Sequence, residues 1–220
     1  MNPVYIVAGG PSLRNFDFQK LKDKTTIVIN KSIFDVPDPT YFLTIDYSFL
    51  QYLSKQNLLN KWKEMSTYKV FIANFSHDYL KIIDDQVVDT RFNLKYNLAD
   101  FNLIIPSYCQ SGIGFTMSDF TSGNNSGFCG LQFAIAMGYN PIYLLGFDLY
   151  TDTETHYHLG YNRSRSQFQK NLQSYFGYFG QALASLKVYR PNLKIYSCSE
   201  KSLLNEFIEY KDFNNIKESL

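Results

Sequence analysis

The stretch Asn125 to Tyr150, NSGFCGLQFAIAMGYNPIYLLGFDLY, decides the fold. It contains a polar loop with Gly127, an apolar helical segment ending at Gly138, a buried strand from Ile142 to Leu145, and a turn from Gly146 onward. In open α/β sheets a helix amino terminus and a strand carboxyl end lie side by side, and ligands bind there. This stretch therefore outlines half of a pocket.

The other half of the pocket is expected near the start of the chain. The apolar run from Val4 to Ala8 is followed directly by Gly9, Gly10 and Pro11. Glycine permits a close backbone approach and proline ends a strand ladder, so this pattern predicts a buried parallel strand that breaks into a turn. The spacing matches neither a dinucleotide fingerprint nor a P-loop. An ordinary tight turn is the alternative interpretation.

Short apolar runs alternate with helical segments along most of the chain, which is typical of a single doubly wound α/β domain with a mostly parallel sheet and helices on both faces. The expected strands are Val4 to Ala8, Thr26 to Ile29, Tyr41 to Ile45, Val70 to Ala73, Ile142 to Leu145 and Leu193 to Tyr196. The expected helices are Tyr47 to Met65, Phe128 to Met137 and Phe168 to Val188. Two segments do not follow this pattern. Phe75 to Ser122 mixes weak strand and loop signals, and the polar segment at about 150–166 is expected to be a lid.

Composition limits the functional classes. A length of 220 residues predicts one domain. A formal charge of +1 gives the protein no overall electrostatic field that would attract nucleic acid or an anionic membrane. Three cysteines without C-x-x-C spacing predict reduced thiols and indicate no metal site. The chain shows neither a signal peptide nor an apolar run near the ~20 residues of a transmembrane segment, so a cytoplasmic protein is expected. Whether it forms a homo-oligomer stays open.

Five short motifs occur in an order that resembles one known family. They are Ala-Gly-Gly-Pro-Ser-Leu from Ala8, Asn30 after the second strand, Asn-Ser-Gly before the helix, Ile-Tyr-Leu-Leu-Gly-Phe-Asp-Leu-Tyr from Ile142, and Ile-Tyr-Ser-Cys-Ser-Glu-Lys-Ser-Leu-Leu from Ile195. Together they resemble the bacterial CMP-sialic acid sialyltransferases that act on lipooligosaccharide. The chain also looks like the wider group of hydroxymethylpterin pyrophosphokinase-like domains. The strongest match lies between Asn125 and Tyr150.

The resemblance implies a Rossmann-like inverting glycosyltransferase that takes a CMP-sugar at the carboxyl ends of its strands. No cofactor is implied, and Mg²⁺ is not expected to be essential. The implied donor-binding residues are Gly9, Gly10, Pro11, Ser12, Asn30, Asp46, Asn125, Ser126, Gly127, Gly146, Phe147, Asp148 and Tyr157. The hydroxyl of Tyr150 is implied as a donor to the leaving phosphate, where negative charge builds in the transition state.

The acceptor hydroxyl must lose a proton, and histidine is suited to accept it near neutral pH. The pair His156-Tyr157 resembles the start of the family's lid, but the family's base position falls on Gly160 here. The chain departs from the family at this point. Either His156 or His158 is then the expected base, and a structural histidine in a lid is the alternative for each. His77 is expected in a surface loop.

A second departure concerns the donor sugar. The family carries an arginine two residues before its Thr-Ser-Gly, near the sugar carboxylate, but Gly123 stands at that position and Asn125 replaces the threonine. Asp46 stands where the family has an amide. A guanidinium is the natural partner of a carboxylate, so its loss predicts a neutral donor sugar.

The acceptor is expected to be a glycan or, in a phage DNA-modification enzyme, a hydroxymethylated pyrimidine in DNA. Arg163 and Arg165, beside Lys170, are the candidate acceptor contacts, and a DNA acceptor predicts activity that falls steeply with salt. A solvated helix face is the other interpretation of this cluster. Two competing functions remain: a pterin pyrophosphokinase-like enzyme using ATP and Mg²⁺ at Asp46 and Asp148, and a non-catalytic nucleotide-binding module.

Overall fold

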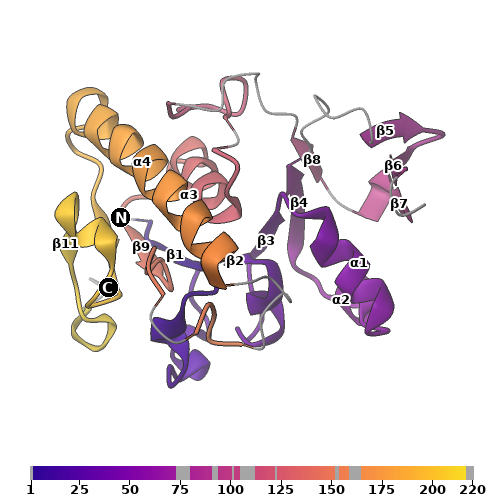
Figure 1. Ribbon diagram of the computed structural model, residues 1–220, viewed down its shortest axis with the longest axis horizontal. Helices are drawn as coiled ribbons and strands as arrows, with labels where there is room; N and C mark the ends of the chain where they lie inside the picture. The colour runs from indigo at the N-terminus through magenta and orange to yellow at the C-terminus, as the bar shows by residue number, and fades with distance from the viewer. Residues whose placement is uncertain are drawn as a thin grey trace.

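The computed structural model describes residues 2–72, 80–90, 94–100, 102–104, 112–121, 123–151, 154–158 and 165–216. The main sheet contains β1 Val4–Val7, β2 Thr26–Ile29, β3 Tyr41–Thr44, β4 Tyr68–Ile72, β8 Asn102–Ile104, β9 Ile142–Leu145, β10 Ile195–Ser197 and β11 Glu209–Tyr210. Within the described ranges this sheet has eight strands in the order β11-β10-β9-β1-β2-β3-β4-β8, and every pairing is parallel (Figure 1). The predicted Rossmann-like α/β fold is confirmed.

The strand order reverses at β1. From β1 the chain adds β2, β3, β4 and β8 on one side, and later adds β9, β10 and β11 on the other side. The carboxyl ends of β1 and β9 therefore meet at a topological switch point, where open α/β sheets leave a crevice for ligands.

Helices cover both faces of the sheet, as the sequence predicted. The α-helices are α1 Tyr47–Lys55, α2 Leu59–Glu64, α3 Ser126–Ala136 and α4 Arg165–Tyr189. The 3₁₀ helices are η1 Pro11–Leu13, η2 Phe18–Leu21, η3 Asn30–Phe34, η4 Leu98–Asp100, η5 Leu203–Glu206 and η6 Phe213–Asn215. Helices α3 and α4 pack on the face that carries Ile6 of β1, whereas α1, α2 and η1 to η3 pack on the face that carries Val7. Because both faces are buried, the strands need apolar residues at successive positions.

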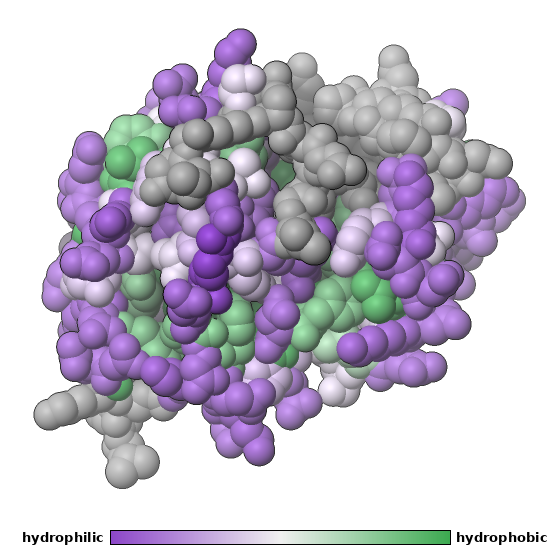
Figure 2. All heavy atoms as spheres, turned by 60° about the horizontal axis from the view of Figure 1, so that its bottom comes forward, coloured by the Kyte–Doolittle hydropathy of each residue, from purple (hydrophilic) through white to green (hydrophobic). Residues whose placement is uncertain are grey.

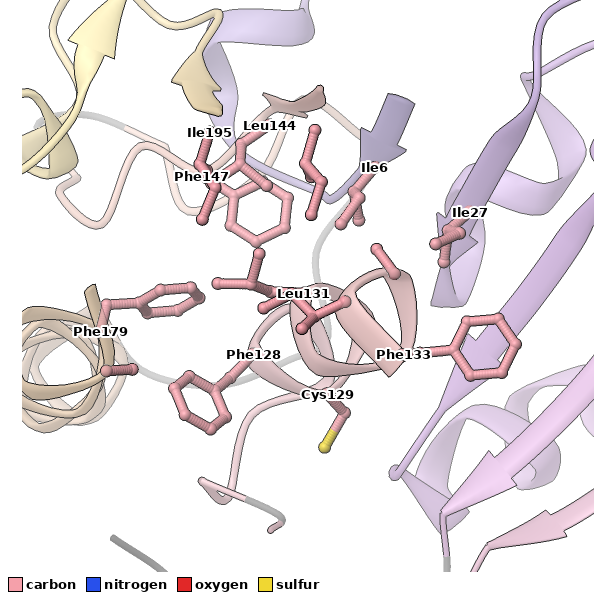
Figure 3. Packing of buried hydrophobic residues seen from close by; sticks show 14 of the residues in the cluster. Ile6, Ile27, Phe128, Cys129, Leu131, Phe133, Leu144, Phe147, Phe179 and Ile195 are labelled. Atoms are coloured by element: carbon pink, nitrogen blue, oxygen red, sulfur yellow. The ribbon is translucent and has the colours of Figure 1, made fainter. Parts of the chain in front are cut away.

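Helix α3 is enclosed on all sides. Every residue from Ser126 to Ile135 is buried, and Phe128 packs edge to face against Phe179 of α4 (Figure 3). The Oε1 atom of Gln132 accepts hydrogen bonds from the N–H groups of Gly114 and Thr121, at 2.8 Å and 3.1 Å. The helix is therefore apolar around its circumference because sheet, α4 and the 112–121 loop all contact it.

On the opposite face, three tyrosines stack across neighbouring strands. The ring of Tyr143 in β9 lies 4.9 Å from that of Tyr5 and 5.5 Å from that of Tyr196. Phe213 of η6 packs edge-on against Tyr5. The carboxyl-terminal segment thus adds to the cover of the face on which α1 and α2 pack. On the face shown in Figure 2, hydrophobic areas are interspersed with hydrophilic side chains.

One sequence prediction needs correction, and one segment without a clear prediction can now be described. The single helix predicted for Tyr47 to Met65 is wrong, because Asn57 adopts a positive φ of 55° and separates α1 from α2. The segment Phe75 to Ser122 contains an antiparallel meander of β5 Leu80–Ile83, β6 Gln86–Asp89 and β7 Leu94–Asn97, followed by β8. None of the described helices has both the length and the apolar character required to cross a membrane.

Close packing of α3 on the sheet depends on Gly130. A Cβ atom at this position would lie 3.0 Å from the Ile29 side chain and 3.2 Å from that of Ile6. We expect Gly130→Val to lower the free energy of unfolding by about 1–3 kcal/mol because the larger side chain overpacks this contact. The matched control is Gly177→Ala in α4, where a Cβ would meet nothing within 4 Å. That change should raise stability by about 0.5–1 kcal/mol. Urea denaturation measures both, and an unchanged Gly130→Val protein would contradict the packing.

Candidate functional site

A cavity of about 320 Å³ lies at the carboxyl ends of β1 and β9. It is bordered by the loops after β1 and β9, the start of α3, a strap formed by residues 154–158, and the first turns of α4. The predicted site residues that line it are Gly9, Gly10, Pro11, Asn30, Asp46, Asn125, Ser126, Gly127, Gly146, Phe147, Asp148, Tyr150 and His156. The two halves predicted from the sequence therefore share one cavity.

The loops after β1 and β9 are in direct contact. The N–H of Gly10 donates to the carbonyl of Gly146 at 3.0 Å, and the N–H of Ser12 donates to Asp148 Oδ2 at 2.9 Å. A Cβ on Gly10 would collide with both partners in the opposite loop, and Gly146 has a φ of +71°. Glycine is thus required at position 10 because there is no room for a side chain, and at position 146 because the backbone has a positive φ.

Ser12 faces the carboxyl-terminal segment and not the cavity. Its hydroxyl lies 2.9 Å from Ser199 Oγ, while Ser202 Oγ donates to the carbonyl of Phe147 at 2.6 Å. The motif that begins at Ile195 therefore supports the turn after β9. The N–H of Gly10 and the hydroxyl of Ser12, which the sequence suggested as hydrogen-bond donors to the nucleotide phosphate, are already engaged within the fold, so this role has no support from the geometry.

Asp148 has an incomplete set of hydrogen bonds. It is 2% exposed and lines the cavity, and Ser12 N–H binds only one of its two oxygens. Within the described part of the chain, its Oδ1 atom has no hydrogen-bond partner. Leaving a buried acceptor unsatisfied costs free energy, so this oxygen is suited to receive an N–H or O–H group from a ligand.

Two polar residues are held on the β2 and β3 side of the cavity by one threonine. The buried hydroxyl of Thr44 donates to Asn30 Oδ1 at 2.6 Å and accepts the N–H of Asp46 at 2.9 Å. Because Oδ1 of Asn30 is engaged in this way, its side chain offers the amide hydrogens to other partners. Asn30 also has a φ of +54°, a conformation that asparagine tolerates better than most residues.

The amino terminus of α3 opens onto the cavity. Asn125 is the N-cap, and its side chain accepts the Phe128 N–H at 2.8 Å. The hydroxyl of Ser126 accepts the N–H of Ile45 at 3.3 Å. The backbone N–H groups of Ser126 and Gly127 come first in the helix and have no intrahelical acceptor. The helix dipole adds partial positive charge here, so the position favours an anion.

The strap carries both candidate bases. His156 lines the cavity, with its ring 4.8 Å from that of Phe168 and its Nδ1 2.9 Å from Thr155 Oγ1. The His158 ring stacks on it at 5.0 Å, although His158 is not among the lining residues. Tyr157 points away from the cavity, and its hydroxyl donates to Asp35 Oδ2 at 2.6 Å.

Sequence reasoning missed one wall of the cavity. Phe168, Leu172 and Tyr175 of α4 line it, and their spacing of four and three residues marks one helix face. That spacing was visible in the sequence, but it is equally typical of a helix that packs on a core. Thr155 and Asn124 also line the cavity. Of the predicted acceptor contacts, Arg165 begins α4, and Arg163 lies outside the described residues, as do His77, Cys109 and much of the 150–166 lid.

The described cysteines are free thiols. Burial raises the pKa of Cys129, and burial also raises the pKa of Cys198 to about 12. Both thiols thus stay protonated and unreactive at neutral pH. In the described ranges, no group of three or more His, Cys, Asp or Glu side chains is arranged to hold a metal ion.

Comparison with known proteins identifies similar folds. No family model and no curated protein matches the chain. The sialyltransferase CstII from Campylobacter jejuni, in complex with the substrate analogue CMP-3FNeuAc, aligns with a TM-score of 0.54 and 19% identity, covering 100% of this chain and 90% of that one. The monofunctional alpha-2,3-sialyltransferase Cst-I from the same organism gives 0.54 and 19%, covering 100% and 83%. The fold implied by the sequence resemblance is confirmed.

Gly9 and Gly10 allow the site geometry to be tested. An alanine Cβ at Gly9 would lie 3.0 Å from His156 Cδ2 and 3.2 Å from His158 Nε2, whereas at Gly10 it would meet the Gly146 backbone. We expect Gly10→Ala to cost about 3 kcal/mol or more of stability, because backbone cannot move aside easily. Gly9→Ala should cost less than about 1 kcal/mol but shift the imidazole NMR signals. Equal stabilities for the two variants would contradict this arrangement.

Proposed function

We propose that the protein is a glycosyltransferase that uses a CMP-sugar and requires no metal ion. The observation that carries this proposal is that the amino terminus of α3, which favours an anion, and the Asp148 carboxylate with one unsatisfied oxygen meet in one cavity. A CMP-sugar has matching groups, namely a phosphate for the helix and hydroxyl or amino hydrogens for the carboxylate. The fold similarity to the CstII complexes supports the same conclusion.

In the proposed complex, the nucleotide spans the switch point. The N–H groups of Ser126 and Gly127 bind the phosphate, and Tyr150 donates its hydroxyl to the same group. Asp148 Oδ1 accepts a hydrogen from the cytidine. As the sugar departs from the phosphate, negative charge grows on the phosphate oxygens, so these donors stabilise the transition state more than the ground state.

The proposed reaction is a direct displacement with inversion. The acceptor oxygen forms a bond to the anomeric carbon while the bond from that carbon to the phosphate oxygen breaks, and CMP leaves with the electron pair. The acceptor proton passes to His156, which lines the cavity. His158, stacked behind it, is the second candidate. The acceptor is an alcohol, on a glycan or on a hydroxymethylated pyrimidine in DNA.

We further propose that the donor sugar is neutral. Gly123 has a φ of +51°, and a Cβ there would collide with the Phe128 ring. Any side chain at this position is excluded, so an arginine cannot reach a sugar carboxylate from here. None of the described residues that line the cavity is lysine or arginine.

Asp46 strengthens the argument for a neutral sugar. Its carboxylate lines the donor cavity, where Thr44 holds its backbone. A second carboxylate about 5 Å away would be repelled by on the order of 1–3 kcal/mol at an effective dielectric constant near 20 or above. Sugar hydroxyls, in contrast, can donate hydrogen bonds to Asp46.

Thermal stability in the presence of nucleotides tests the proposed function. We expect CMP with EDTA to raise the melting temperature, since a ligand that binds only the folded state stabilises it. Asp148→Asn should reduce this shift, because the amide presents hydrogens or a weaker acceptor to the cytidine. Stabilisation by ATP with Mg²⁺ and none by CMP would favour the pyrophosphokinase alternative and contradict the proposal.

The histidines separate a transferase from a binding module. The double variant His156→Ala with His158→Ala should keep the CMP-induced shift and lose turnover, because it removes the base and leaves the nucleotide contacts in place. His77→Ala is the matched control. If the double variant retained full turnover, neither strap histidine would be the base.

A panel of labelled CMP-sugars tests the donor class. We expect neutral donors to be consumed at least about tenfold faster than CMP-sialic acid, in line with the repulsion of a carboxylate by Asp46. Asp46→Asn should narrow this ratio, while Asp38→Asn, an exposed turn residue, should leave it unchanged. Exclusive consumption of CMP-sialic acid would overturn the neutral-donor proposal.

A further inference from the structure

We propose that Tyr157 and Asp35 form a latch outside the cavity that positions the imidazole of His156. This inference rests on the proposed transferase function, in which His156 is the base. Neither latch residue is among those that line the cavity, so the pair acts through the strap and not on the substrate.

Tyr157 holds the latch in place through four contacts. The hydroxyl of Tyr157 donates to Asp35 Oδ2 at 2.6 Å and lies 3.3 Å from Ser32 Oγ. The Tyr157 N–H donates to the carbonyl of Gly9 at 3.1 Å, and its ring packs on Phe18 with 5.4 Å between centroids. Tyr157 is therefore fixed to the amino-terminal part of the fold by its main chain, its ring and its hydroxyl.

The two neighbouring strap residues face opposite sides of the sheet. Tyr157 packs against the core cluster that contains Val7, on the face covered by α1 and α2. His156 contacts Phe168, which packs against the other cluster, under α3 and α4. The strap thus passes over the carboxyl end of β1 at Gly9, from one face of the sheet to the other. Fixing Tyr157 on one face therefore determines where the imidazole of the adjacent His156 lies on the other.

Ser32 connects the latch to the cavity wall. Its hydroxyl donates to the carbonyl of Ala8 at 3.0 Å, next to the Gly9 carbonyl that binds the strap. The strap is also tied to the residue after η1 by the ion pair between Arg14 and Glu154, which is about half exposed. Exposed ion pairs contribute little. The bond from the Tyr157 hydroxyl to Asp35 is exposed as well, but it is a short hydrogen bond to a carboxylate, which is one of the stronger kinds. The Tyr157 hydroxyl is therefore a polar anchor of the strap.

Removing this anchor should affect turnover and leave donor binding intact. We expect Tyr157→Phe and Asp35→Ala each to lower kcat by about tenfold to hundredfold, because a displacement of about 1 Å in a catalytic group has an effect of that order. The KM for the donor and the CMP-induced melting shift should stay within about twofold. The double variant should be no slower than the slower single variant, since both changes remove the same bond.

Two further variants separate positioning from stability. Asp35→Asn keeps an oxygen that can accept the Tyr157 hydrogen bond, so we expect it to restore most of kcat. Tyr41→Phe is the matched control, because it removes the 2.9 Å bond between the hydroxyls of Tyr41 and Tyr139 at the start of β3, the end of the sheet opposite the cavity. It should lower stability without lowering kcat.

Imidazole NMR of the substrate-free protein completes the test. The chain has three histidines, so the Cε1–H signals are few, and those of His156 and His158 should shift or broaden in Tyr157→Phe but not in Tyr41→Phe. Unmoved signals or an unchanged kcat would overturn the latch. If the wild-type protein consumed no CMP-sugar while these signals still moved, the transferase proposal would fail and the positioning of the imidazole by Tyr157 would stand.

Discussion

The cavity depends on one close backbone contact, the 3.0 Å hydrogen bond from Gly10 to Gly146. It joins the loops after two strands that are neighbours in space but remote in sequence, and neither loop has room for a side chain at the contact. The bond from Ser12 N–H to Asp148, across 136 residues of sequence, is possible only because the loops meet. With that bond made, one carboxylate oxygen of Asp148 is anchored, and the other has no hydrogen-bond partner among the described residues.

The sheet could be predicted from sequence because its strands are buried on both faces. In β1, Val4 and Ile6 serve one core while Tyr5 and Val7 serve the other, so the strand appears as an unbroken apolar run. The location of the cavity followed from the rule that ligands bind at strand carboxyl ends near a switch point. The antiparallel meander showed only weak strand signals and its arrangement was not predicted, since its short strands include exposed residues such as Ile82 and carry little alternation.

The side-chain roles were harder to foresee because the partners come from distant segments. Nothing near Ser12 reveals that its hydroxyl meets Ser199, 187 residues away. Tyr157 lies beside a histidine that lines the cavity, yet its hydroxyl points to Asp35 on the other face of the sheet. A motif identifies which loop approaches a ligand, but the side to which each residue turns is set by what packs behind it.

The central position of β1 has a consequence for synthesis of the protein. The strand leaves the ribosome well before its neighbour β9, which follows more than 130 residues later, and Phe213, which covers Tyr5, follows later still. At ~5–20 residues per second, β1 waits on the order of ten seconds or more with one edge unpaired. An unpaired apolar edge strand is a template for aggregation, so this edge of β1 is open to mispairing until β9 has been made.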